Sequence, residues 1–183
     1  VTEIRAIAER PAKRIWSGYF DSTHCKDLVK QILPLPGGPR PKIPYGGTPR
    51  IGEAHFYFTM QPVNPDLLAR SAYEFNCCQA TSDADVVAYD LFGVDVDPRR
   101  PSGISSTDQE KEAARGVADR VGQWLKARGI DHIPADSGNG YHLLVPTILY
   151  TDVGSASAKA HVLLKLLDRE FSTEEVSVDT TVY

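Results

Sequence analysis

Apolar and polar residues alternate along several short stretches of the chain, which is typical of β-strands buried on one face. The stretches that favour strands are 14–20, 55–60, 86–97, 131–135, the run that follows the glycines at 138 and 140, and the closing segment VSVDTTVY. The segment 86–97 is the most apolar of these, and it ends in two carboxylates. We therefore expect sheets that connect distant parts of the chain.

Other stretches carry apolar residues at helical spacing. Thr107 and Glu110 form a capping box, which predicts a long helix from there to about residue 128. Its expected buried stripe is Ala113, Val117, Val121, Trp124 and Leu125. A second long helix is expected over 155–170, with Val162, Leu163, Leu166 and Leu167 facing inward.

Three further helices are expected in the first seventy residues. The pattern predicts one over 3–14, where Ile4, Ile7 and Ala8 share a side. Asp21, Ser22 and Thr23 offer caps for another, whose apolar positions are Leu28, Ile32 and Leu33. Asn64 and Pro65 open a short one that runs to Arg70. Strands and helices mix without strict alternation, so the fold class expected is α+β.

Residues 34–50 are dominated by proline and glycine, so they predict neither a helix nor a central strand. This segment carries Arg40, Lys42 and Arg50. A loop of that length inside a compact domain is often functional. A surface excursion without a role is an equally good interpretation.

Composition bounds the class of protein. The chain has 183 residues, 42% hydrophobic and 24% charged, with a formal net charge of -4. These values are typical of one globular domain rather than a disordered or fibrous chain. No apolar run is long enough for a membrane span, and no secretory signal is visible at the start, so no membrane partner is expected. Mild acidity argues against a protein that coats nucleic acid over its whole surface, but it leaves room for a local basic groove.

Cys25, Cys77 and Cys78 are too few and too poorly spaced for a disulfide framework or a structural zinc site. A reducing compartment is the simplest interpretation, and we expect a cytoplasmic protein.

The end of the apolar strand carries the first candidate chemistry. In Val94-Asp95-Val96-Asp97, the valines can face the core while Asp95 and Asp97 share the other face. Two carboxylates that close repel each other unless a cation lies between them, and oxygen ligands suit Mg²⁺ or Mn²⁺. Two solvated aspartates at a strand end are the alternative. A second D-x-D, Asp83 and Asp85, follows no apolar strand and is interpreted as loop or cap residues.

Two later segments add to this chemistry. Asp179 again lies off the apolar face of a strand, because Val176 and Val178 alternate with polar residues. Three aspartates on neighbouring strands would form a carboxylate cage of the kind used in two-metal phosphoryl transfer. The segment 136–142, DSGNGYH, combines a glycine turn with a hydroxyl and an imidazole, which together could hold a polyphosphate. A plain turn and a core histidine are the alternatives.

As a set, these residues resemble the archaeo-eukaryotic primase superfamily, and within it the primase-polymerase domains of phage and plasmid replication proteins. The matching motifs are GVDVDP (93–98), SGNGYH (137–142) and SVD (177–179), in the family's order and with similar spacing. Softer similarity includes SGYFD near the start, MQPVNPDLLAR (60–70) and DPRRPSGISSTDQE (97–110).

The resemblance implies roles for individual residues. Asp95, Asp97 and Asp179 would be the catalytic residues and bind two Mg²⁺ or Mn²⁺ ions. Ser137 and His142 would contact the triphosphate of a nucleoside triphosphate, with Gly138, Asn139 and Gly140 forming the turn around it. The chemistry implied is attack of a 3′-hydroxyl on an α-phosphate along a single-stranded DNA template.

The resemblance also implies an architecture. An RRM-like catalytic sheet over residues 81–183 would pack with a second small α/β unit over 1–80. In the phage-type branch the late aspartate is followed by an Asn-x-x-Arg stretch and a further segment. This chain stops at Tyr183, so we expect part of the site to lie beyond it or to be missing. A helicase, in the same chain or a separate one, is an expected partner.

Several basic and aromatic residues are candidates for nucleic-acid or nucleotide contact. Arg99 and Arg100 lie next to the expected metal ligands and are assigned to the nucleotide. Other candidates for contact with DNA are Arg40, Lys42 and Arg50, then the weaker group Arg5, Arg10, Lys13 and Arg14, and the aromatic residues Tyr45, His55 and Tyr57. For most of these a solvated face or a core position is the competing interpretation.

Two rival functions remain open. One is a module that binds nucleotide or single-stranded DNA without turnover. The other is a glycosyltransferase, in which a D-x-D would hold Mn²⁺ and a sugar diphosphate. The second rival leaves SGNGYH without an evident role.

Overall fold

The computed structural model describes residues 1–8, 14–24, 55–73, 75 and 79–182. These residues form two compact units, Val1–Ala88 and Tyr89–Tyr183. Each contains an antiparallel sheet, and the α+β class predicted from the sequence is confirmed. The three cysteines, the helix expected after Thr23 and the loop 34–50 lie outside the described residues. None of the helices that are described is long and apolar enough to cross a membrane.

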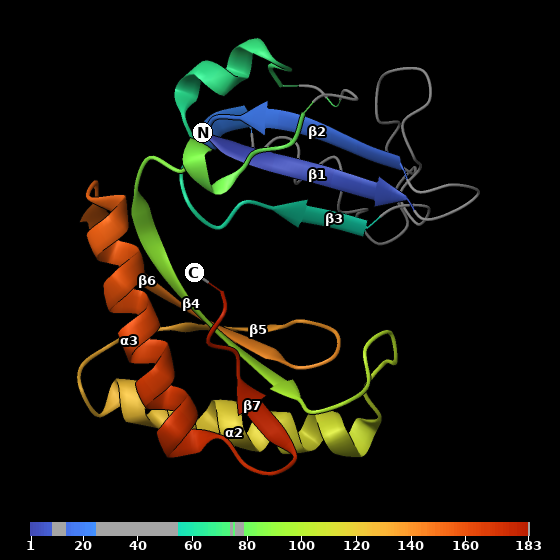
Figure 1. Ribbon diagram of the computed structural model, residues 1–183, viewed down its shortest axis with the longest axis vertical. Coiled ribbons are helices and arrows are strands. Elements are labelled where there is room, and N and C mark those ends of the chain that lie inside the picture. Colours follow the sequence, from blue (N-terminus) through green and yellow to red (C-terminus); the bar gives the residue numbers. More distant parts are fainter. Residues whose placement is uncertain (9–13, 25–54, 74, 76–78, 183) are drawn as a thin grey trace. The chain divides into compact units, whose positions relative to one another are not determined.

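The first unit is built on a three-stranded sheet (Figure 1). Its order is β2 (Arg14–Phe20), β1 (Thr2–Ala8) and β3 (His55–Phe58), with β1 in the centre and antiparallel to both neighbours. The strands expected over 14–20 and 55–60 are confirmed, but the helix expected over 3–14 is wrong. Ile4 and Ala6 are buried at two-residue spacing, so this segment buries a strand face.

The described part of the first unit also contains two short 3-10 helices, and residues 22–24 are helical after Asp21, whose carboxylate accepts from the N–H groups of Thr23 and His24. Residues Pro65–Ala69 form η1, whose start is capped by the side chain of Asn64, in agreement with the short helix expected there. Residues Asp83–Asp85 form η2, where the Asp85 carboxylate accepts hydrogen bonds from the backbone and hydroxyl of Ser82. The second D-x-D is therefore a capping structure, as predicted.

The second unit has the element order β-α-β-β-α-β. Its elements are β4 (Tyr89–Pro98), α2 (Asp108–Lys126), β5 (Ile133–Asp136), β6 (Tyr141–Tyr150), α3 (Val153–Phe171) and β7 (Val176–Val178). The sheet order is β5-β6-β4-β7, and every neighbouring pair is antiparallel. Strand β4 thus lies between β6 and β7, two elements that are separated by 25 residues in sequence, 151–175.

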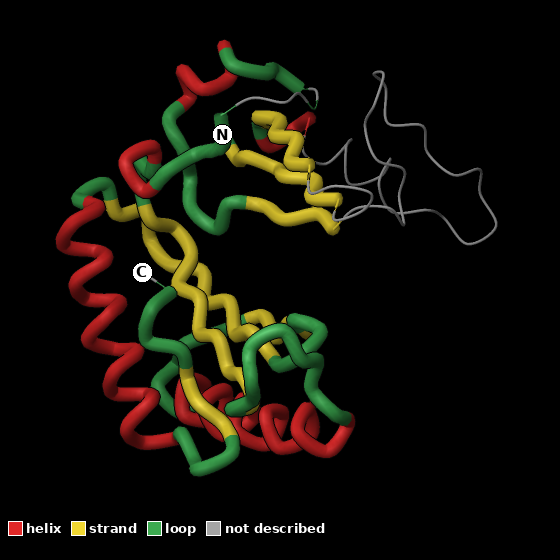
Figure 2. The backbone as a smooth tube through the Cα atoms, turned by 45° about the vertical axis from the view of Figure 1, so that its right-hand side comes forward, coloured by secondary structure: helices red, strands yellow, loops and turns green. Residues whose placement is uncertain are grey.

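Both long helices pack on the same face of this sheet (Figures 1 and 2). Val94 and Val96 of β4 are fully buried in one core cluster together with Val121 of α2 and Leu164 of α3. Because side chains alternate along a strand, Asp95 and Asp97 lie on the opposite face of the sheet. The predicted division between valines and aspartates is confirmed.

The predicted helices of this unit are present, with one error in packing. Thr107 and Glu110 form the expected capping box at the start of α2. In α3, however, Val162 is 69% exposed, so the prediction that it faces inward is wrong. The buried stripe consists of Ala156, Ala160, Leu164 and Leu167. Leucines at positions 163, 164, 166 and 167 point in several directions around the helix, so the sequence alone did not show which side of the helix is buried.

Candidate functional site

The candidate site lies on the face of β4 that points away from α2 and α3; in the part of the chain that the structure describes, this is the helix-free face of the sheet. In the ladder with β6, Asp95 lies opposite His142, and in the ladder with β7, Asp97 lies opposite Ser177. Directly paired residues on neighbouring strands project to the same face, so all four side chains belong to one surface. The side chains of Asp95 and Asp97 are 27% and 39% exposed. They are therefore shielded but open to a small ligand.

The two aspartates carry unsatisfied oxygens. Asp95 Oδ1 and Asp97 Oδ1 are buried and accept no hydrogen bond from the described residues. Burial, and then the nearby charge of Asp95, raise the pKa of the Asp97 carboxyl, while Arg100 and His142 oppose that rise. The Arg100 guanidinium lies 3.8 Å from Asp97 Oδ2. Two shielded carboxylates with orphaned oxygens are a fitting donor set for a hard divalent cation.

His142 is held against the first aspartate. Its Nε2 lies 3.2 Å from Asp95 Oδ1, an ion-pair contact that lacks the alignment of a hydrogen bond. The interaction with Asp95 raises the pKa of His142, although partial burial opposes that effect. The imidazole therefore holds a proton more readily than a free histidine.

Asp179 reaches the site through its backbone. Its N–H donates to the Asp95 carbonyl at 2.9 Å, so the ends of β4 and β7 lie together. Its carboxylate, however, accepts hydrogen bonds from the backbone N–H and the hydroxyl of Thr181, each at 2.7 Å. Within the described ranges, no three acidic, histidine or cysteine side chains surround a common point suited to a metal ion. Two aspartates thus share the sheet face, and the third lies beside them with one carboxylate oxygen, Oδ1, engaged by Thr181. The charge of Asp179 also contributes to raising the pKa of Asp97.

The glycine turn 137–140 is closed by its own hydrogen bonds. Gly138 has a positive φ of 93°, and its N–H donates to Asp136 Oδ1 at 2.7 Å. The Gly140 N–H donates to Ser137 Oγ at 3.0 Å, and the Ser137 N–H donates to the Gly140 carbonyl at 3.1 Å. The N–H groups expected to approach an anion are therefore engaged within the turn.

The turn lies directly against the second aspartate. A β-carbon at Gly140 would overlap the Asp97 carboxylate and the Val96 carbonyl, so this position requires glycine. Asn139 Oδ1 accepts a hydrogen bond from the Ser106 N–H at 3.1 Å, which fixes the turn to the loop before α2. The structure therefore brings GVDVDP and SGNGYH together, and it gives Asn139 a bracing contact.

The two arginines after β4 differ in role. Arg100 is largely buried, and its guanidinium donates to the carbonyls of Ile104 and Pro98 at 2.9 and 3.1 Å. Arg99 is exposed and donates to the Thr173 carbonyl at 3.3 Å. Both line an open hollow of about 500 Å³ that also includes Asp97 and Ser177. This hollow adjoins Asp97, whereas Asp95 and His142 do not line it, and its two arginines suit an anionic ligand.

The remaining basic and aromatic candidates lie elsewhere. Arg5 pairs with the fully buried Glu3 at 2.7 Å and donates to the Thr81 carbonyl at 2.9 Å, so its role is structural. Tyr57 is 53% exposed on β3, and the expectation that it might be core is wrong. The side chains of Arg10, Lys13, Arg14, Arg40, Lys42, Tyr45, Arg50 and His55 lie outside the described residues.

Two contributors were missed in the sequence. Ser177 faces Asp97, and its alternation with Val176 and Val178 was a usable signal. Lys111 of α2 forms an ion pair with Asp136 at 2.8 Å and so anchors the start of the turn. Nothing in the sequence indicates that pairing, because the two residues are 25 positions apart.

Comparison with known proteins gave no match to a family model, to a curated protein or to a solved structure.

Proposed function

We propose that this chain is a template-dependent DNA primase-polymerase domain that transfers a nucleotide from a nucleoside triphosphate to a 3′-hydroxyl. One observation carries the proposal: Asp95 and Asp97 share a helix-free sheet face with His142, and the glycine turn abuts Asp97. These are the residues that the family resemblance assigned to metal and triphosphate, and they come from separate motifs. Their proximity in space is what the proposed chemistry requires.

The topology of the second unit supports the proposal. An order β-α-β-β-α-β, with a sheet ordered β5-β6-β4-β7 and both helices on one face, is that of split β-α-β units such as the RRM. In such a unit the central strands expose a face free of helices. The proposed site lies on the central strands β4 and β6.

The residues have separable roles in this proposal. Asp95 and Asp97 would hold Mg²⁺ or Mn²⁺, which when bound supplies charge stabilisation to the attacking and leaving oxygens. His142, whose pKa is raised by Asp95, would present a positive charge to the triphosphate and act as a phosphate ligand rather than as a general base. Arg99 and Arg100 would add positive charge along the adjacent hollow.

A second function is favoured by one specific observation. The Asp179 carboxylate is bound to Thr181, and the N–H groups of Gly138 and Gly140 are bound within their own turn. A site fixed in this arrangement would leave at most Oδ2 of Asp179 for a metal ion, and it would hold no N–H of Gly138 or Gly140 ready for a phosphate. It would then bind nucleotide or single-stranded DNA without transferring a nucleotide.

Primer extension separates the two functions. The full chain is mixed with a primed single-stranded DNA template, Mg²⁺ or Mn²⁺, and either ribonucleoside or deoxyribonucleoside triphosphates. We expect the parent to lengthen the primer. Loss of Asp95 and Asp97 should reduce the rate at least a hundredfold, because removing stabilisation of transition-state charge typically costs about two to three orders of magnitude.

A matched control removes the same charge elsewhere. Asp119 and Asp131 are exposed in the second unit, and neither lines the hollow beside Asp97. The Asp119→Ala/Asp131→Ala variant should extend the primer like the parent, whereas Asp95→Ala/Asp97→Ala should not. Retained extension by Asp95→Ala/Asp97→Ala would contradict the assignment. Absence of extension by the parent, with triphosphate binding intact, would favour the binding module.

A further inference from the structure

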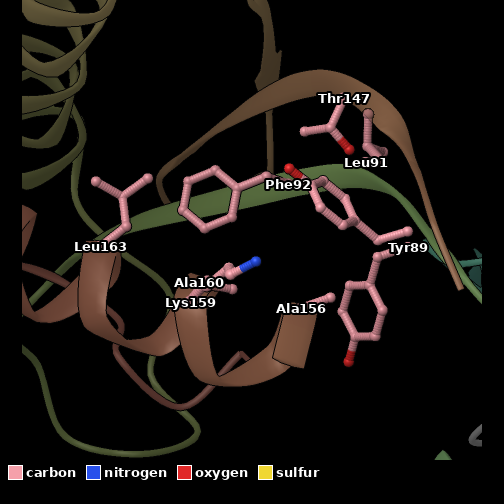
Figure 3. A pocket seen from close by; sticks show the side chains of 9 residues that line it. Tyr89, Leu91, Phe92, Thr147, Ala156, Lys159, Ala160 and Leu163 are labelled. Carbon is pink, nitrogen blue, oxygen red and sulfur yellow. The ribbon is translucent and has the colours of Figure 1, made fainter. Parts of the chain in front are cut away.

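A second pocket lies in the same unit, away from the aspartates. It is formed by the beginning of β4, the end of β6 and the first half of α3 (Figure 3). Its lining is Tyr89, Leu91, Phe92, Thr147, Tyr150, Ala156, Lys159, Ala160 and Leu163. The two candidate functions above make no use of this pocket.

A break in the β4–β6 ladder opens the pocket. Tyr89 pairs with Tyr150 and Leu91 with Pro146, so three residues of β6 stand against one of β4. This bulge contains Thr147, Ile148 and Leu149, and it lifts β6 away from regular pairing. Bulges of this kind are frequent beside functional sites, because they redirect side chains.

Size and chemistry limit what the pocket can hold. Its volume is about 210 Å³. A cavity of about 150 Å³ lined by apolar side chains accommodates one benzene ring, so this pocket fits a single aromatic side chain and is too small for a nucleotide. Among its nine described lining residues, Lys159 carries the only charge, and its ammonium lies 5.4 Å from the Tyr150 ring centroid. The pocket therefore suits an apolar ring that has an anionic group beside it, where that group can pair with Lys159.

The surroundings favour a polypeptide over a small molecule. Ile148, Leu149 and Val162, which adjoin lining residues in sequence, are 73%, 61% and 69% exposed. In addition, β5 pairs with β6 only as far as Leu144, and no strand in the described ranges continues that side of β6 to Tyr150. An exposed edge beside apolar residues is a surface that extended peptides recognise.

We propose that this pocket binds a partner protein through an extended acidic segment with one aromatic anchor. The ring enters between β4 and α3, an acidic residue beside it pairs with Lys159, and the segment covers Ile148 and Leu149. Binding of this kind would leave the helix-free face of β4 accessible, and it does not depend on the function proposed for that face.

The test uses the full chain labelled with ¹⁵N and three synthetic heptapeptides at physiological salt. The probe has a central phenylalanine with three aspartates on each side. One comparison peptide replaces the phenylalanine with alanine, and the other replaces the aspartates with lysine. We expect the probe alone to shift the amide signals of Leu91, Thr147 and Ala156. Each comparison peptide should bind at least tenfold more weakly.

Two charge-matched variants locate the contact. Lys159 and Lys165 are both exposed on α3, but only Lys159 lines the pocket. Lys159→Glu should weaken probe binding at least fivefold, whereas Lys165→Glu should change it less than twofold, and unchanged spectra elsewhere would show that both variants fold. Equal weakening by the two variants, absence of shifts with the probe, or equal binding of free phenylpropionate would each overturn the proposal.

Discussion

At the residue scale, the site depends on two partly buried carboxylates whose burial lowers the stability of the folded protein. Asp95 and Asp97 both carry a buried oxygen without a hydrogen-bond partner, and burial together with Asp95 raises the pKa of Asp97. His142 and Arg100 offset these charges only in part, and proteins keep buried oxygens without hydrogen bonds mainly where a ligand will bind them. Stability and function should therefore respond in opposite directions when Asp97 loses its charge.

Asp97→Asn should make the protein more stable at neutral pH. The pKa of Asp97 is higher in the folded than in the unfolded protein, so its protonated form favours folding. This stabilisation is fully present below the unfolded pKa of about 4 and is lost as pH rises through the folded pKa. Asparagine removes the charge at every pH. We expect the melting temperature of Asp97→Asn at pH 7 to exceed that of the parent by on the order of 1–3 °C. Near pH 3 the two melting temperatures should become equal.

Two controls accompany that measurement. Asp119→Asn removes an exposed charge of α2 and should leave the melting temperature unchanged at both pH values. Addition of Mg²⁺ should stabilise the parent and have little effect on Asp97→Asn, because the cation replaces the missing partner of the carboxylate. A variant that melts below the parent at pH 7 would show that the Asp97 charge is already compensated within the protein.

At the element scale, the sequence predicted the second unit better than the first. The capping box at Thr107 and the valine–aspartate alternation of β4 are local signals, and both were correct. The segment 3–14 was predicted as a helix because Ile4, Ile7 and Ala8 fit a helical spacing, whereas residues Thr2–Ala8 form β1. Pairing with β2 and β3 on both sides decides in favour of a strand, and that information is not local.

The glycine turn offers a test of how closely β4 and β6 must meet. Gly140→Ala would place a methyl group against the Asp97 carboxylate and the Val96 carbonyl, and we expect a loss of about 1–3 kcal/mol in the free energy of unfolding. Gly116→Ala in α2 is the matched control, because a methyl group there meets only the end of Arg120 at 3.9 Å. It should stabilise the protein by up to about 1 kcal/mol.

Urea unfolding of the two variants provides both values. Equal stability of Gly140→Ala and the parent would mean that the turn can move away from Asp97 without cost. In that case the glycine would not be needed for the approach of the two motifs, and their proximity would be a weaker argument for a shared site.

At the scale of the whole molecule, the strand order decides which residues can act together. Asp95, His142 and Asp179 are spread over more than 80 positions, and the sheet order β6-β4-β7 brings them side by side. The sequence indicated each strand, but neighbours within a sheet follow from long-range pairing. Asp179 accepts from Thr181 two positions later, which is a common local contact for aspartate, but the sequence does not show that Asp179 makes this contact instead of facing Asp95.

The central claim is that this end of β4 binds a triphosphate together with a divalent cation, which the proposed nucleotide transfer requires. Isothermal titration calorimetry with a deoxynucleoside triphosphate, with and without Mn²⁺, tests it on the parent, Asp95→Ala/Asp97→Ala and Asp119→Ala/Asp131→Ala. We predict binding that needs Mn²⁺, falls at least tenfold in the first variant and persists in the second. Binding that ignores Mn²⁺ or survives loss of both site aspartates would contradict the claim, as would a preference for a uridine diphosphate sugar.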